Sequence, residues 1–337
     1  MNSPKKTRFA MIGAGAISQA YAQAFEQSDD VELVAVADVR PEAAEAIANT
    51  CGCKSYGSHE RMLKDTAFDA AIVCTPPITH PEICNELLGK GIHVLCEKPL
   101  AIDSVSAQSM IDAANASGAK FTMASKFRFV EDVIKAKSIV ESGILGEIIL
   151  LENTFTGYVD MSSRWNSKKE ISGGGVLIDN GTHSVDLIRY FLGPLAELQV
   201  GEGKRTQGLE VEDTVRLFVR TVGDVMGSID LSWSINKQLP HYVSIYGALG
   251  TVFVGWQESK YRRSSDDNWI CFGSGYNKIQ AFKDQIANFD GAIRGTETLL
   301  LKPEDALASV AVIEAAYEAL QSNIWVPVGQ SASNSAA

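Results

Sequence analysis

The stretch RFAMIGAGAIS, residues 8–18, joins an apolar run to an alanine-rich segment through two closely spaced glycines. A strand that passes into a helix in this way places the free N–H groups and the partial positive charge of the helix N-terminus at the turn. Gly13 permits a tight turn, Gly15 lets the backbone approach a phosphate closely, and Ser18 stands where the helix packs on the strand. The stretch therefore predicts a phosphate-binding turn between a strand and a helix.

Apolar runs and alanine-rich stretches alternate from Arg8 to about Ala124. The runs are continuously apolar, as expected for parallel strands that are covered on both faces. Strand and helix repeated several times indicate βαβ units and a doubly wound sheet with right-handed connections. The sequence therefore predicts an α/β fold with a Rossmann domain over residues 1–125. The apolar runs are RFAMIG, VELVAVAD, FDAAIVCT, IHVLCEK and KFTMAS.

The pattern changes after about Ser125, where longer strands follow. Gly223-Asp224 and the corner Gly247–Gly250 are typical of hairpin turns, which indicate a mostly antiparallel sheet. We expect an α+β domain with a large open sheet over residues 126–330 and a disordered tail over 331–337. The expected strands are 147–156, 213–222, 225–235, 241–246 and 251–256, and the expected helices are 130–142, 176–192, 277–294 and 303–322.

The composition excludes several classes of protein. Of 337 residues, 41 are acidic and 30 basic, and the net charge of −11 argues against a nucleic-acid partner. The apolar runs are too short to cross a bilayer, and the start of the chain has no secretory signal pattern. The six cysteines are irregularly spaced, and Cys51-Gly-Cys53 with His59 fits no common zinc pattern. We expect a cytoplasmic protein with no membrane partner and no metal.

Asp38 lies 20 residues beyond Ser18, at the end of the second apolar run. An acid at this place accepts hydrogen bonds from the adenosine ribose of a dinucleotide. Because a carboxylate repels the 2′-phosphate of NADP, Asp38 favours NAD. Arg40 can offset this repulsion and hold the extra phosphate, which leaves NADP open. A glycine turn that serves packing alone is the alternative interpretation of the whole motif.

Lys98 follows the apolar run Ile92–Leu95, within Cys96-Glu97-Lys98-Pro99. The carboxyl ends of the strands of a doubly wound sheet face the ligand crevice, which predicts a lysine poised over the cofactor. Pro99 restricts the backbone of Lys98 and allows a cis peptide bond. A surface lysine without function is the alternative.

Asp179 and His183 stand four residues apart in a predicted helix that begins after the glycines of Gly173–Gly175. They therefore share one face of the helix, with Asp186 three residues further on. A carboxylate next to an imidazole orients the ring and stabilises its protonated form, which suits a general base for an alcohol. A core histidine bonded to a neighbouring acid is an equally good interpretation of the pair alone.

Together, these motifs resemble the Gfo/Idh/MocA oxidoreductases, the family of glucose–fructose oxidoreductase and inositol dehydrogenase. The resemblance extends from Arg8 to about Val328. It implies a Rossmann domain followed by an open antiparallel sheet that often serves oligomerisation. It also implies that Lys98 is the catalytic lysine and that Asp179 and His183 are the acid–histidine pair at the substrate carbinol. The motifs that carry it are GAGAIS, Asp38, Thr75-Pro76-Pro77, Glu97-Lys98-Pro99 and GGGxLxDxGxHxxD.

Further residues are candidates for binding NAD and the substrate, and the loop of Arg164 and Trp165 either overhangs the substrate or packs on a subunit interface. His80 either contacts the dinucleotide or only begins the next helix, and Arg128 either contacts the cofactor or forms a structural ion pair. The expected cofactor-binding residues are Gly13, Gly15, Ala16, Ile17, Asp38, Arg40, Thr75, Pro76, Pro77, His80, Glu97, Lys98 and Arg128. The candidate substrate residues are Tyr158, Arg164, Trp165, Asn180 and Tyr276.

We expect an NAD(H)-dependent dehydrogenase or reductase that acts on a secondary alcohol of a sugar, polyol or cyclitol. His183, oriented by Asp179, takes the hydroxyl proton, Lys98 stabilises the oxygen, and the hydride passes to the nicotinamide. A redox-neutral NAD-dependent glycosidase or lyase that works through a transient ketone would need the same residues. A non-catalytic NAD-binding regulator is a third interpretation.

The second half of the chain also predicts self-association. Long strands such as those of 213–235 leave one face of a sheet that needs cover. We therefore expect a homo-oligomer, either a dimer or a tetramer.

Overall fold

The computed structural model describes residues 5–329, and the chain divides into two compact units. The first unit combines Met1–Phe129 with Asn277–Ala306. The second unit combines Val130–Tyr276 with Leu307–Ala337. Each unit has its own sheet.

The sequence prediction differs from this division in the place of residues 277–306. It assigned all of 126–330 to the second domain, whereas helix α9 (Lys278–Arg294) belongs to the first unit. The ring of Phe282 on α9 lies 4.5 Å from the ring of Tyr21, edge to face, inside the core of that unit. An apolar helix face shows that a helix is buried, but it does not show which core takes it.

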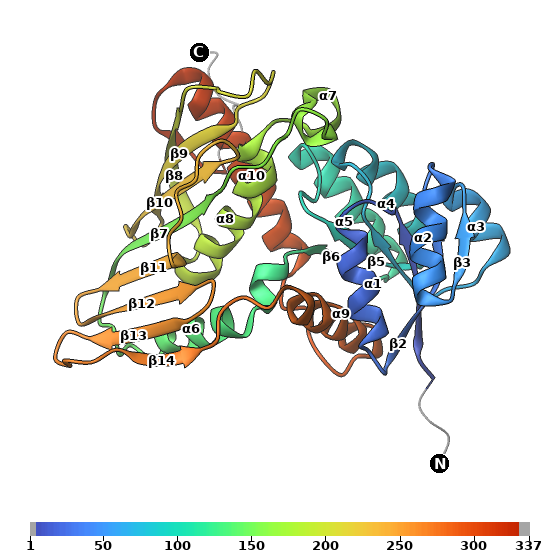
Figure 1. Ribbon diagram of the computed structural model, residues 1–337, viewed down its shortest axis with the longest axis horizontal. Helices are drawn as coiled ribbons and strands as arrows, with labels where there is room; N and C mark the ends of the chain where they lie inside the picture. Colours follow the sequence, from blue (N-terminus) through green and yellow to red (C-terminus); the bar gives the residue numbers. More distant parts are fainter. Residues whose placement is uncertain (1–4, 330–337) are drawn as a thin grey trace. The chain divides into compact units, whose positions relative to one another are not determined.

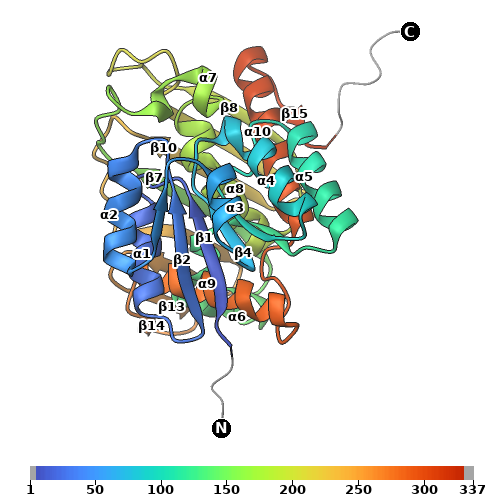
Figure 2. The ribbon, with the colours of Figure 1, turned by 90° about the vertical axis from the view of Figure 1, so that its right-hand side faces the viewer.

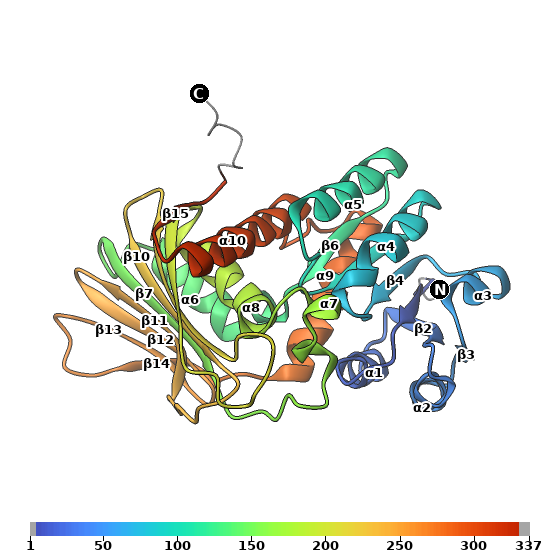
Figure 3. The same ribbon diagram turned by 90° about the horizontal axis from the view of Figure 1, so that it is seen from above.

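The first unit is a parallel sheet of six strands in the order β3-β2-β1-β4-β5-β6. Figure 2 shows β2, β1 and β4 side by side, and Figure 3 shows α1 and α2 on one face of the sheet and α4 and α5 on the other. The doubly wound domain predicted from the continuously apolar runs is confirmed. The strands are β1 (Thr7–Ile12), β2 (Val31–Ala37), β3 (Lys54–Tyr56), β4 (Ala70–Val73), β5 (His93–Glu97) and β6 (Phe121–Ala124), and the α-helices are α1 (Ser18–Glu26), α2 (Pro41–Cys51), α3 (His59–Asp65), α4 (His80–Gly89), α5 (Ser104–Ser117) and α9.

The second unit is built on a nine-stranded sheet in the order β14-β13-β12-β11-β7-β10-β9-β8-β15. Among the described strands, β7 and β10 are parallel neighbours and all other neighbours are antiparallel. Figures 1 and 3 show α6 and α8 on the same face of this sheet. The strands are β7 (Ile148–Thr156), β8 (Leu195–Glu202), β9 (Thr214–Thr221), β10 (Met226–Ser232), β11 (His241–Gly247), β12 (Gly250–Gly255), β13 (Ser259–Arg263), β14 (Ile270–Gly273) and β15 (Val326–Pro327), and the helices are α6 (Glu131–Glu141), α7 (Lys169–Ser172), α8 (Val176–Leu192) and most of α10 (Pro303–Ser322), which belongs to this unit from Leu307 on.

The large, mostly antiparallel sheet confirms the second part of the fold prediction. The turn at Gly223-Asp224 joins β9 to its antiparallel neighbour β10, and Asp224 has a φ of 63°, as a tight turn requires. The strands β8, β13, β14 and β15 were not predicted. One residue of β13 and none of β14 is buried, so these strands lack the apolar pattern that marks a buried strand.

Other expectations concern the whole chain. All six cysteines are free thiols. No helix within residues 5–329 is both long enough and apolar enough to cross a membrane. In the same residues, no three histidine, cysteine or acidic side chains gather as metal ligands would. The tail expected to be disordered, 331–337, lies outside the described residues.

Candidate active site

Gly13 makes the turn between β1 and α1. Its φ of 96° lies in the left-handed region that favours glycine. A Cβ at this position would lie 2.7 Å from the carbonyl carbon and oxygen of Cys74, directly after β4. The buried Ser18 hydroxyl donates a hydrogen bond to the carbonyl oxygen of Gly13 at 2.7 Å. Serine at the third motif position therefore closes the turn itself.

The N-terminus of α1 presents hydrogen-bond donors. Within the part of the chain that the structure describes, the N–H groups of Gly15, Ala16 and Ile17 donate to no other residue. Apart from its two chain neighbours, no atom of residues 5–329 lies within 4 Å of the place that a Cβ on Gly15 would take, so packing does not explain this glycine. Three free donors at the positive end of a helix suit an anion such as the diphosphate of a dinucleotide. The residues of this turn therefore fit that group.

Asp38 follows β2 and lies beside this turn. Its Oδ2 accepts a hydrogen bond from the N–H of Ala14 at 2.6 Å, and its Oδ1 accepts one from the N–H of Arg40 at 2.8 Å. Burial alone would raise the pKa of Asp38, but the hydrogen bonds from Arg40 and Ala14 outweigh it and lower the pKa. The carboxylate is therefore charged at neutral pH.

Arg40 directs its guanidinium toward Asp38. The Nε and Nη2 atoms lie 3.2 and 3.4 Å from the two carboxylate oxygens, and the arginine side chain is 58% exposed. The cation therefore partners the acid that is expected to bind the ribose. The pair with Asp38 leaves fewer N–H groups of this guanidinium for a 2′-phosphate.

The loops after β4 and β5 meet at His80, the first residue of α4. The buried ring places Nε2 2.8 Å from the carbonyl oxygen of Thr75 and Nδ1 3.1 Å from that of Pro99. Burial lowers the pKa of His80, and a neutral imidazole carries one N–H, so one of these contacts is a hydrogen bond. His80 thus braces the loop of Thr75, Pro76 and Pro77 against the loop that follows Lys98. A contact with the cofactor stays a prediction.

Lys98 directly follows β5, and a cis peptide bond joins it to Pro99. The N–H of Lys98 donates to Glu97 Oε2 at 3.0 Å, and the Tyr21 hydroxyl donates to Glu97 Oε1 at 2.8 Å. Tyr21 in turn accepts a hydrogen bond from Gln285 Nε2 at 3.0 Å. Burial raises the pKa of Glu97, and the charge of Lys98 opposes this rise. Glu97 therefore anchors the backbone of Lys98 to α1 and, through Tyr21, to α9.

Arg128 lies in a short 3-10 turn, Lys126–Phe129, and its side chain is buried. Its Nη1 lies 4.0 Å from Oδ2 of Asp305. Arg128 thus forms an ion pair, and its contact with the cofactor stays a prediction.

Helix α8 carries Asp179 and His183 one turn apart, on the same side of the helix. His183 is only 8% exposed, Asp179 is half-buried and Asp186 is fully buried. The His183 ring meets the ring of Phe155 from β7 edge to face, with centroids 6.4 Å apart. The predicted pair is therefore part of one helix that packs on the sheet.

Phe155 begins a chain of aromatic rings next to His183. It stacks on Tyr242 with centroids 5.8 Å apart, Tyr242 contacts Trp256 at 4.6 Å, and Trp256 contacts Tyr276 at 5.8 Å. Tyr276, a candidate substrate residue, thus belongs to the same cluster as His183. The cluster gives the imidazole apolar surroundings on this side.

The other candidate substrate residues are more accessible. Tyr158, Arg164 and Trp165 are all exposed. Asn180 follows Asp179 on α8 and is half-buried. Their contact with a substrate stays a prediction.

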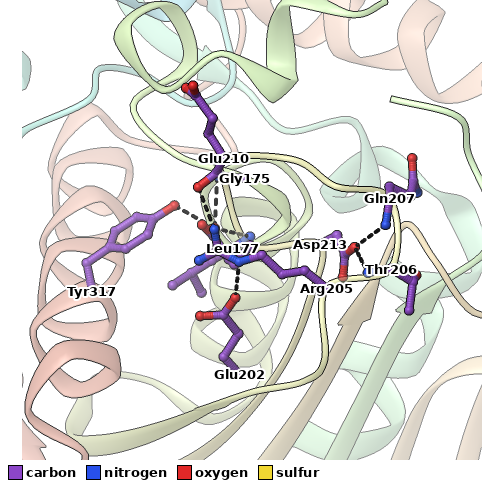
Figure 4. A network of polar contacts seen from close by, with 10 residues as sticks. Gly175, Leu177, Glu202, Arg205, Thr206, Gln207, Glu210, Asp213 and Tyr317 are labelled. Atoms are coloured by element: carbon purple, nitrogen blue, oxygen red, sulfur yellow. Dashed lines mark hydrogen bonds and ion pairs between the residues drawn. The ribbon is translucent and has the colours of Figure 1, made fainter. Parts of the chain in front are cut away.

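Sequence reasoning missed two adjacent acids, Glu212 and Asp213, which accept hydrogen bonds from segments around the start of α8. Figure 4 shows Asp213 beside Thr206 and Gln207. Oε1 of Glu212 accepts hydrogen bonds from the Gly175 N–H at 2.9 Å, the Leu177 N–H at 3.1 Å and the Tyr317 hydroxyl at 2.8 Å. Burial raises the pKa of Glu212.

Asp213 holds a second segment through Gln207. Its Oδ2 accepts a hydrogen bond from the N–H of Thr206 at 3.0 Å, and a longer contact comes from the N–H of Gln207 at 3.4 Å. The Gln207 amide then donates to the carbonyl oxygen of Val159 and accepts from the N–H of Met161, both at 3.0 Å. Two acids directly before a strand with a buried face are the signal that could have identified this pair.

Models of known families match both parts of this chain. Residues 7–125 match the model described as an oxidoreductase family with an NAD-binding Rossmann fold, and residues 133–253 match the GFO/IDH/MocA C-terminal domain. The chain belongs to the Gfo/Idh/MocA family of oxidoreductases. Membership confirms the resemblance carried by the motifs, and with it NAD as the cofactor.

Individual relatives resemble this chain over most of its length. Inositol 2-dehydrogenase of Rhizobium meliloti (strain 1021) is 26% identical over 329 residues, which are 92% of this chain and 95% of that protein. The 2,7-anhydro-N-acetylneuraminate hydratase of Escherichia coli (strain K12) is 26% identical over 257 residues, 74% of this chain and 68% of that protein. A solved structure of levoglucosan dehydrogenase with NADH and levoglucosan has a TM-score of 0.88 at 21% identity, with 97% of this chain and 100% of that chain covered. This last likeness concerns the fold.

Proposed function

We propose that this oxidoreductase oxidises a secondary alcohol of a sugar, polyol or cyclitol with NAD, or reduces the corresponding ketone with NADH. The observation that carries the proposal is the α1 turn, where three unbonded N–H groups and the charged Asp38 provide the contacts that a dinucleotide needs. The similarity to inositol 2-dehydrogenase supports a polyhydroxylated substrate.

Gly15, Ala16 and Ile17 would hold the diphosphate through backbone N–H groups, and Asp38 would accept hydrogen bonds from the ribose hydroxyls. Gly13 would shape the turn, since its own N–H donates to the carbonyl oxygen of Ala37 at 2.8 Å. When bound, the nicotinamide supplies hydride chemistry that no side chain can perform.

Lys98 and His183 act on the same substrate hydroxyl in two different roles. His183 accepts the hydroxyl proton at a ring nitrogen, and Asp179, on the same side of α8, orients the ring and stabilises its protonated form. Lys98 donates a charge-assisted hydrogen bond to the same oxygen and stabilises the negative charge that develops there. In the reverse direction, His183 returns the proton and Lys98 polarises the carbonyl.

The test is NADH formation, followed by its absorbance, against a panel of sugars, inositols and sugar phosphates, with NAD and NADP in parallel. The expected result is turnover with NAD on at least one polyhydroxylated substrate. If cofactor binding is measured directly and no substrate of the panel reduces NAD, the proposed dehydrogenase activity is contradicted.

A redox-neutral reaction is the second candidate. The similarity to a 2,7-anhydro-N-acetylneuraminate hydratase favours it, because that relative is not named for a net redox reaction. Such a reaction would use Lys98 and His183 through a transient ketone and would regenerate NAD. Product analysis by mass spectrometry separates the two: addition or loss of water, or release of an aglycone without accumulated NADH, supports the redox-neutral enzyme.

A further inference from the structure

Helix α8 begins without a side-chain cap of its own. Its N-cap residue is Gly175, which has no side chain to accept a hydrogen bond. The first N–H groups of a helix have no partner within the helix, so a buried helix start needs acceptors from elsewhere. The helix that carries His183 therefore needs hydrogen-bond acceptors from another segment at its start.

Glu212 supplies the missing acceptors. Its carboxylate oxygen Oε1 accepts from the N–H groups of Gly175 and Leu177, and its main-chain carbonyl accepts from the N–H of Val176 at 2.9 Å. Three consecutive donors of the α8 start are thus bonded to one residue. Glu212 is only 4% exposed, so water does not substitute for it.

Tyr317 on α10 fixes the Glu212 carboxylate from the other side. Its hydroxyl donates to the same Oε1 at 2.8 Å, and Figure 4 shows the tyrosine pointing toward Gly175 and Leu177. Side chains larger than glycine do not fit at the two positions before α8. A Cβ on Gly174 would lie 1.8 Å from the Tyr317 hydroxyl, and a Cβ on Gly175 would lie 2.1 Å from the Glu212 carbonyl oxygen. The glycines before α8 are therefore explained by the close approach of Glu212 and Tyr317.

The position of the α8 start determines the position of His183, because both belong to one continuous helix. The N–H of Asp179 donates to the carbonyl oxygen of Gly175 at 3.0 Å, inside the turn that Glu212 holds. Further along, a Cβ on Gly181 would lie 3.2 Å from Leu231 of β10, so α8 is also seated closely on the sheet. Asp179 and His183 lie in the first two turns after the anchored end.

We propose that Glu212 is a positioning residue for the Asp179–His183 pair: together with Tyr317, it fixes the start of α8 and thereby the place of the His183 imidazole. This inference rests on the proposed function, in which His183 handles the substrate proton. It also assigns the first N–H groups of α8 to the protein itself, so this helix start is not where a substrate phosphate binds.

The test compares two substitutions at position 212 whose side chains are about as long as that of glutamate. E212Q keeps an oxygen acceptor, whereas E212M fills the same space without one. D230N is the matched control, because Asp230 is a carboxylate of the same unit that pairs with Arg216 and Lys237 instead of with α8. All proteins are full-length and are assayed at a temperature at which each is folded by circular dichroism.

The expected kinetic result is a drop in kcat of about 100-fold for E212M, with the Kd for NAD unchanged, since misplacing a catalytic group by about 1 Å costs this much. E212Q and D230N should remain within a few-fold of the wild type. An E212M variant with wild-type kcat, or an E212Q variant as impaired as E212M, would overturn the proposal. If E212M does not fold, Y317F removes one donor and keeps the carboxylate: a kcat about tenfold lower supports the proposal, and an unchanged kcat overturns it.

A second readout does not depend on activity. The chain has five histidines, so ¹⁵N-histidine labelling resolves the imidazole signals, and H183A identifies the signal of His183. E212M should shift or broaden the His183 signals while E212Q and D230N leave them in place. If the wild type turns over no alcohol, the proposed function fails, but this measurement still decides the role of Glu212: unmoved His183 signals in E212M would contradict it.

Discussion

At the scale of single residues, the proposed chemistry depends on Lys98 and His183. Lys98→Ala and His183→Ala should each lower kcat by about 10²- to 10⁴-fold, because each removes a group that acts on the proton or charge of the reacting oxygen. The Kd for NAD should change little for His183→Ala, since that residue lies on a helix of the second unit and not in the Rossmann unit. Steady-state kinetics and fluorescence titration with NADH measure both quantities. Normal turnover in both variants would contradict the assignment.

Asp38 and Arg40 set the choice between NAD and NADP. In Asp38→Ser, the carboxylate that repels a 2′-phosphate is lost and the guanidinium is released from its ion pair. We expect the ratio of kcat/KM for NADP over NAD to rise by about tenfold or more, the equivalent of about 1.4 kcal/mol. The double variant Asp38→Ser/Arg40→Ala is the control, and it should lose this gain. A gain that persists in the double variant would show that Arg40 does not bind the phosphate.

Gly13 is the residue of the turn that tolerates substitution least. Gly13→Ala should destabilise the folded state by about 2 kcal/mol or more, because φ lies in the left-handed region and the added Cβ meets the backbone of Cys74. Gly15→Ala is the matched control, since its Cβ meets no atom within 4 Å. Urea unfolding measures the free energy of each variant. We expect Gly15→Ala to keep stability but to weaken NAD binding, and equal stability of both variants would contradict this reading of the turn.

At the scale of elements, His80 braces the loops after β4 and β5. Burial lowers the pKa of His80, so the folded state keeps the ring neutral while the unfolded chain takes up a proton below about pH 6.5. The stability that the neutral His80 ring contributes is fully present above about pH 6.5, and it is lost as the pH falls from there through the pKa of His80 in the folded state. The wild type should therefore lose more unfolding free energy between about pH 7.5 and about pH 5.5 than His80→Gln does. Equal losses in urea titrations would show that His80 does not carry this dependence.

The elements also show how far sequence reasoning reaches. Strand β1, the Gly13 turn, Asp38 and the His183 helix were predicted because each is encoded by residues close together in the chain. The Tyr21–Gln285 bond joins residues 264 positions apart, and the Tyr317–Glu212 bond joins residues 105 positions apart. Periodicity and motif spacing contain no information about such pairings. For this reason the place of α9 and the cap of α8 emerged only from the structure.

At the scale of the whole molecule, the nine-stranded sheet carries its helices α6 and α8 on one face. Phe218 and Met226 lie on neighbouring strands of this sheet and are 41% and 50% exposed. We propose that a second copy of the chain covers them, as expected for a homo-oligomer. Light scattering coupled to size-exclusion chromatography should give a dimer or tetramer, and the double variant Phe218→Asp/Met226→Asp should shift the mass toward the monomer. A monomeric wild type at micromolar concentration would contradict this prediction.

In the proposed reaction, hydride passes directly from a substrate carbon to NAD. The test uses an inositol or sugar that the enzyme turns over, with deuterium on the carbon that is oxidised. Mass spectrometry then measures the deuterium in the NADH that forms. We expect NADH that carries one deuterium, and His183→Ala should form it far more slowly. NADH without deuterium, or deuterium that returns to the product while NAD is regenerated, would contradict a net dehydrogenase reaction.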